Sequence, residues 1–210
     1  MHAHCSSGGC GNHAPWPCPC PSGGNAHLSE PARLVACFLQ MQGSLAAEAA
    51  FYSQLATPTA ALHEALHALA DDIGLRPEHS TLPEDVADQL TTLLLPTVPL
   101  LAALTDFTTA HRTLLQYGAP GGLTPLTAYD TALRFGMNTG LKPNQIFIHD
   151  GNRDSIVALH LTPPDSSWLD QAELPAALQD MTAAEAELCL SLCTCQWQWL
   201  ATADASPGTL

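Results

Sequence analysis

The sequence predicts a mainly α-helical protein. We expect a single helical domain of about six helices over residues 32–202, with an irregular N-terminal arm at 1–31 and a flexible tail at 203–210. Apolar residues recur at steps of three and four, the period of an amphipathic helix, and helix start and stop signals separate the periodic segments. In the arm, closely spaced Gly and Pro residues prevent regular secondary structure.

The first helix is expected from Ala32 to Leu55, loosened at Gly43. Thr57 and Pro58 end it and open a second helix, because proline is favoured in a first helical turn. Three further helices follow at about 83–95, 100–117 and 126–138. Glycine and proline residues bound each of them.

The one β-like passage begins at Gln145, where Ile146-Phe147-Ile148 precedes the turn signal Asp150-Gly151-Asn152. A short β-hairpin near 145–161 is one interpretation. The other makes Asp154 the N-cap of a helix over 155–161, and the sequence leaves both open.

The last helix is expected from Ala183 to about Thr202, since Thr182 and Glu185 have the spacing of a capping box. If that helix is continuous, one face of it points to the core. The residues of that face are Leu188, Leu192, Cys195 and Trp199.

The net charge of the chain limits the classes of partner that we expect it to bind. Six Lys and Arg stand against twenty Asp and Glu, a formal net charge of −14. Such a charge repels phosphate backbones, so nucleic acid is excluded as a general partner, while cations or a basic protein partner are favoured. No apolar stretch is long enough to span a membrane, and no secretory leader is evident. We therefore expect a cytoplasmic protein whose cysteines bind metal rather than form disulfides.

The arm is dense in soft-metal ligands. They are His2, His4, Cys5, Cys10, His13, Cys18 and Cys20. Zinc takes four tetrahedral Cys and His ligands, although none of these spacings is a standard zinc knuckle. Zinc is the expected metal, and copper or an iron–sulfur cluster is the alternative.

A second candidate metal site lies on the second helix, where His63-Glu64-Ala65-Leu66-His67 fits the H-E-x-x-H pattern. Helical spacing puts both imidazoles on one face, with Glu64 beside them as the general base. These residues resemble the zincin class of metallopeptidases, which implies a zinc site with a third protein ligand. Candidates for that ligand are Glu78, His79, Glu84 and Asp85, and Glu48 could join Glu64 and His67 in a helical-bundle site.

A second cysteine cluster, Cys189, Cys193 and Cys195, lies near the C-terminus. On a helix, the first two face the same way, and the third points elsewhere. The cluster could supply metal ligands if the arm folds back. The ordinary alternative is that these cysteines, like Cys37, are small core residues.

Together these patterns predict a metal-binding accessory protein, in metal handling or cofactor assembly, with its site in the arm. A zinc-dependent hydrolase that uses Glu64 is the alternative, and an interaction module with a purely structural metal is a third.

Overall fold

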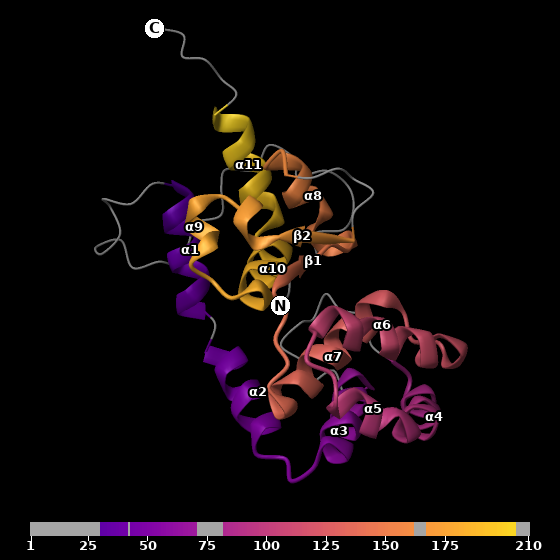
Figure 1. Cartoon of the computed structure of the whole chain (residues 1–210). Helices are drawn as coiled ribbons and strands as arrows, with labels where there is room; N and C mark the ends of the chain where they lie inside the picture. The colour runs from indigo at the N-terminus through magenta and orange to yellow at the C-terminus, as the bar shows by residue number, and fades with distance from the viewer. Residues whose placement is uncertain (1–29, 42, 71–81, 162–166, 205–210) are drawn as a thin grey trace, which may run out of the picture.

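The computed structural model describes residues 30–41, 43–70, 82–161 and 167–204. The arm, the end of the tail and the segment with Glu78 and His79 lie outside these ranges. The described residues are mainly helical, as predicted, and they form two lobes (Figure 1). The expected number of about six helices was wrong, because the helices run from α1 to α11 and several predicted helices are divided.

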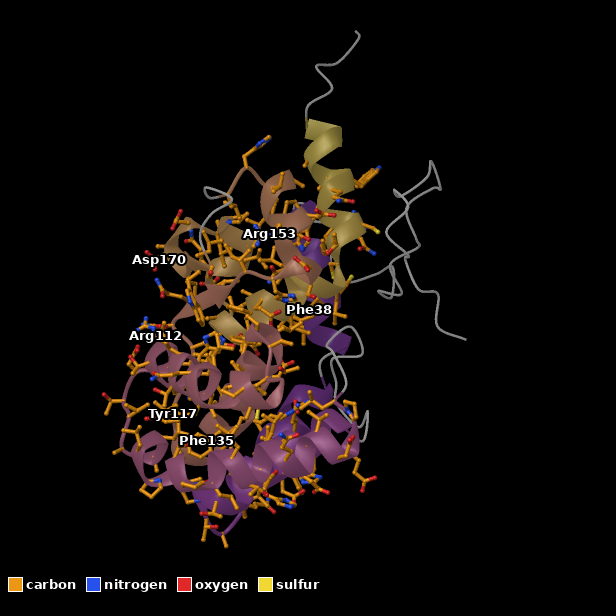
Figure 2. All side chains as sticks on the ribbon, turned by 90° about the vertical axis from the view of Figure 1, so that its right-hand side faces the viewer. Phe38, Arg112, Tyr117, Phe135, Arg153 and Asp170 are labelled. Carbon is orange, nitrogen blue, oxygen red and sulfur yellow. The ribbon has the colours of Figure 1, made fainter. Side chains whose placement is uncertain are left out.

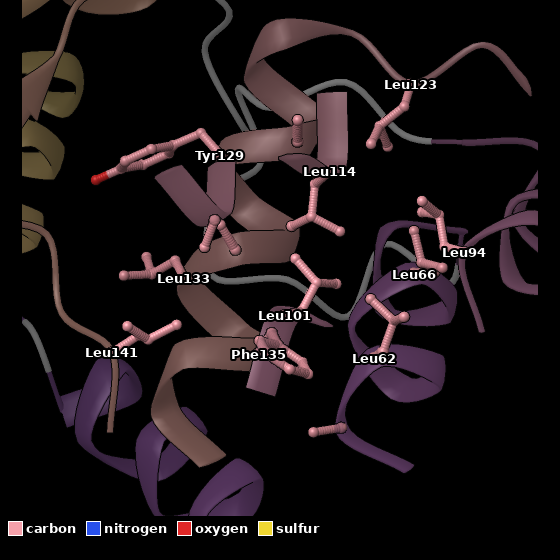
Figure 3. Packing of buried hydrophobic residues seen from close by; sticks show 14 of the residues in the cluster. Leu62, Leu66, Leu94, Leu101, Leu114, Leu123, Tyr129, Leu133, Phe135 and Leu141 are labelled. Atoms are coloured by element: carbon pink, nitrogen blue, oxygen red, sulfur yellow. The ribbon is translucent and has the colours of Figure 1, made fainter. Parts of the chain in front are cut away.

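The lower lobe contains α2 to α7. Its helices are α2 (Gly43–Ser53), α3 (Pro58–Ala70), α4 (Glu84–Leu94), α5 (Val98–Ala102), α6 (Phe107–Gly118) and α7 (Pro125–Thr139), with short 3-10 turns at Leu95–Thr97 and Ala119–Gly121. Helix α7 is central, since α2, α3 and α6 all pack against it. Leucines and Phe135 from these helices fill the space between them (Figure 3).

Local sequence explains why α7 forms where it does. The Thr124 hydroxyl accepts a hydrogen bond from the Thr127 amide, Pro125 occupies the first turn, and Gly140 ends the helix in a left-handed conformation (φ 85°). Every residue from Thr127 to Gly136 is buried, so α7 is covered on all sides.

The upper lobe contains α1 (Glu30–Met41) and the chain after residue 145. Its other elements are β1 (Gln145–Phe147), α8 (Asp150–Ala158), β2 (Trp168–Asp170), a 3-10 turn at Gln171–Glu173, α9 (Ala176–Gln179), α10 (Ala183–Leu192) and α11 (Thr194–Asp204). A second buried cluster forms here, with Trp197 and Phe38 among its members. Figure 2 shows Phe38 in this lobe and Phe135 in the lower one.

Aromatic rings join the two lobes. Phe147 of β1 stacks on Tyr129 of α7 at a centroid distance of 5.0 Å. His111 of α6 lies 5.1 Å from Phe147 and 5.4 Å from Trp168 of β2. The His111 Nε2 hydrogen bonds to the Pro125 carbonyl oxygen at 2.9 Å, and burial lowers the pKa of this histidine.

Of the two interpretations of 145–161, the hairpin was wrong, and a helix forms in this segment, although with other bounds than expected. Strand β1 exists, but its antiparallel partner is β2, with Ile146 opposite Leu169. The intervening helix α8 begins after His149, which caps it, and not after Asp154. The His149 Nδ1 accepts the Gly151 amide, and the Asn152 side chain accepts the His149 amide, so the Asp-Gly-Asn signal opens a helix instead of a turn.

Three predicted helices are divided. The helix expected over 32–55 is the two helices α1 and α2. The helix expected over 100–117 is interrupted at Asp106, whose carboxylate accepts the Thr109 amide and caps α6. The last helix is interrupted at Cys193, which lies between α10 and α11. This break changes the helical phase of α11. The predicted inner face was right for Leu188, which is buried, and wrong for Leu192 and Trp199. Trp197 is fully buried, whereas Leu192 and Trp199 are each nearly half exposed.

Candidate functional site

The H-E-x-x-H residues lie on α3, as predicted, at the outer side of the lower lobe. Leu62 and Leu66 face the core and are fully buried. His63 is exposed, whereas His67, one helical turn later, is partly buried, with its side chain 21% exposed. The rings of His63 and His67 stack with their centroids 4.3 Å apart. Glu64 lies beside them, with its Oε1 3.4 Å from His63 Nδ1.

A carboxylate from the next helix reaches this pair. Asp88 Oδ1 of α4 lies 3.5 Å from His67 Nε2, and that nitrogen is buried without a hydrogen-bond partner. Asp88 was not among the expected third ligands. Its position one turn after Glu84 on the same helix was the available signal, but only the packing of α3 against α4 decides which turn of α4 meets His67.

Within the described ranges, no three or more His, Cys, Asp and Glu side chains are grouped so that they could hold a metal ion. Glu48 does not stand beside His67 as the helical-bundle hypothesis required. Its Oε1 accepts a hydrogen bond from Arg134 Nε at 2.7 Å, which joins α2 to α7. The predicted arm ligands, from His2 to Cys20, lie outside the described residues.

The second cysteine cluster lies where α10 meets α11. Cys189 and Cys193 are buried, as the core interpretation predicted, and Cys195 is partly exposed. All three are reduced. Cys189 donates a hydrogen bond to Cys193, which lowers the pKa of the Cys193 thiol against the opposing effect of burial. The same hydrogen bond, together with burial, raises the pKa of Cys189.

Cys37 of α1 is buried, as expected of a core residue, but it is also disulfide-bonded. The expectation that the cysteines of this chain form no disulfides was therefore wrong for Cys37.

A buried polar cluster that was not predicted from the sequence lies beside β1. His149 Nε2 lies 2.7 Å from Glu187 Oε1 of α10, and Glu187 is fully buried. Because the His149 Nδ1 accepts the Gly151 amide, the proton of a neutral ring lies on Nε2, and this nitrogen donates to the carboxylate.

Asn152 and Ser155 complete this cluster. The Asn152 amide donates to the Phe147 carbonyl, and the Ser155 hydroxyl donates to the Leu190 carbonyl at 2.6 Å. These bonds hold α8 against β1 and α10. No sequence signal could have paired residues 149 and 187, because 38 positions separate them.

None of the helices in the described residues has the length and apolar character needed to cross a membrane. Comparisons of this chain with protein-family models, with curated proteins and with solved structures give no match. The chemistry of its own residues therefore carries the functional argument.

Proposed function

We propose that this chain is a metal-binding accessory protein, in metal handling or cofactor assembly, whose arm binds zinc through Cys and His side chains. The observation that carries the proposal is the ligand density of the sequence. Four cysteines and three histidines fall within residues 1–20. Such a segment is too poor in apolar side chains to form a core of its own, and a structural zinc ion supplies folding free energy to segments of this kind.

Charge is the second support. The net charge of −14 favours the approach of divalent cations to the surface of the protein. The helical lobes would then serve as the body that presents the arm to a partner. That body is well defined, with two buried clusters and capped helices.

The test is elemental analysis of protein purified without added metal. We expect about one zinc ion per chain. Replacement of Cys5, Cys10, Cys18 and Cys20 by serine should remove it, whereas the matched double variant His63→Ala/His67→Ala should retain it. A chain that folds fully and carries no metal would overturn the proposal. A brown protein with visible absorbance would show that the bound group is an iron–sulfur cluster and not zinc.

A second candidate function is zinc-dependent hydrolysis at α3. The observation that favours it is the stacked pair His63 and His67, with the His67 Nε2 near Asp88 and without a hydrogen-bond partner. Two imidazoles one helical turn apart are the zinc ligands of the H-E-x-x-H pattern, but the described residues supply no complete three-ligand set. A bound zinc ion would lower the pKa of a coordinated water. Glu64 would take the proton from that water.

This candidate has its own test. Hydrolysis of an unfolded protein substrate would be measured after addition of zinc to the full chain. We expect activity that is lost in Glu64→Gln and retained in Glu173→Gln, which changes an exposed carboxylate of the upper lobe. If zinc is lost only in the arm variant and no hydrolysis occurs, the hydrolase hypothesis is wrong.

A further inference from the structure

The junction of α10 and α11 brings two thiols together. Cys189 lies in the last turn of α10, and Cys193 is the residue that follows the helix. Positions four apart lie on one face of a helix, with Cα atoms roughly 6 Å apart, inside the range that disulfides span. The two thiols already contact each other through the hydrogen bond from Cys189 to Cys193.

We propose that Cys189 and Cys193 form a peroxide-sensitive dithiol, which oxidises to a disulfide at the junction of α10 and α11. Neither residue belongs to the arm or to the histidine pair of α3, so the proposal is independent of the functions above.

The backbone at the junction permits the bond. Cys193 has φ −104° and ψ 23°, outside the helical conformation of α10, and Thr194 begins the next helix. A residue between two helices can shift its Cα with less loss of helical hydrogen bonding than a residue inside one. Cys193 is therefore the residue whose Cα shifts when the bond forms. Cys189 stays in place, because its carbonyl accepts hydrogen bonds from the Cys193 amide and the Trp197 indole.

The chemistry assigns different roles to the two thiols. Cys193 has the lowered pKa and a small exposed fraction, 5%, whereas Cys189 has the raised pKa and is fully buried. The thiolate is the nucleophile in cysteine oxidation, so Cys193 reacts first. A peroxide is small enough to reach a thiol that is nearly covered, which a bulky disulfide substrate is not.

The reaction has two balanced steps. The Cys193 sulfur attacks one oxygen of hydrogen peroxide, the O–O bond breaks, and the thiol proton leaves with the other oxygen as water, which gives a sulfenic acid at Cys193. The Cys189 sulfur then attacks the Cys193 sulfur. The S–S bond forms, the S–O bond breaks, and the hydroxide leaves as water with the Cys189 proton.

Peptide mass analysis tests the proposal cleanly. Glu187 is followed by no acidic residue before Asp204, so cleavage after glutamate gives one peptide with Cys189, Cys193, Cys195 and no other cysteine. The full-length protein would be treated with hydrogen peroxide, unfolded in the presence of a maleimide that blocks every remaining thiol, and then cleaved. We expect this peptide to lose the mass of two hydrogens and to carry a single maleimide, at Cys195.

Two variants locate the bond. Cys195→Ser is the matched control and should still lose two hydrogens, whereas Cys193→Ser should retain both remaining thiols for the maleimide. A wild-type peptide that carries three maleimides, or that gains oxygen without loss of hydrogen, would overturn the proposal. So would a bond that disappears in Cys195→Ser. The wild-type measurement alone decides the question if a variant does not fold.

Discussion

His149 and Glu187 form a buried pair that fastens the central segment of the upper lobe to α10. The His149 Nε2 donates to the Glu187 carboxylate at 2.7 Å, and the two side chains are 6% and 0% exposed. Because His149 also caps α8, one imidazole connects three elements: β1, α8 and α10.

Removal of either partner should destabilise the fold. His149→Ala leaves a buried carboxylate without its imidazole donor, and Glu187→Ala leaves the imidazole without that acceptor. We expect each variant to lose about 3 kcal/mol in free energy of unfolding. Denaturant titration of both single variants and the double variant would measure the coupling. The double variant should lose less than the sum of the two single losses, and strict additivity would contradict the pairing.

We expect a similar loss of stability when the buried Arg134–Glu48 pair of the lower lobe is broken. Their side chains are 4% and 12% exposed, and Arg134 Nε donates to Glu48. We expect Arg134→Met to lower the free energy of unfolding by about 3 kcal/mol, because Glu48 would lose its partner while largely buried. Arg112→Met on the exposed side of α6 is the control, with an expected change of about 0.5 kcal/mol or less. Equal losses of unfolding free energy in the two variants would show that the buried Arg134–Glu48 pair contributes no more to stability than an exposed arginine.

Gly136 is a glycine that the packing of α7 requires. A Cβ atom at this position would overlap the carbonyl oxygen of Leu141, which is backbone and cannot turn away. We expect Gly136→Ala to lower the free energy of unfolding by about 1 to 3 kcal/mol in thermal or denaturant unfolding. Gly140→Asn is the comparison, since nothing lies within 4 Å of a Cβ there and asparagine tolerates the left-handed backbone. The loss of unfolding free energy in Gly140→Asn should be smaller than that in Gly136→Ala.

His111 should make stability depend on pH. Burial lowers the pKa of this histidine below its usual value near 6.5, so the unfolded chain binds a proton that the folded chain resists. The contribution of His111 is complete above pH ~6.5 and is lost as the pH falls towards the folded pKa. Its slope is at most about 1.4 kcal/mol per pH unit. His111→Phe retains an aromatic ring and should flatten the unfolding profile between pH 5 and 7. An unchanged slope would contradict this account.

The sequence by itself determined the local helices of the lower lobe. Thr57-Pro58, Pro83-Glu84 and Gly140 marked boundaries of α3, α4 and α7 to within a few residues, because caps and breakers act on adjacent backbone. It also placed His63 and His67 on one face of α3, since helical period alone sets that relationship.

Tertiary structure decided the pairings. The sequence could not tell that β1 pairs with β2 across α8, that Glu48 meets Arg134, or that Glu187 meets His149. These contacts join residues 21 or more positions apart, and their free energy depends on burial that exists only after the helices pack. The break at Cys193 was also decided by tertiary structure. Burial of Trp197 sets the phase of α11, and the thiols of Cys189 and Cys193 lie at the junction with α10.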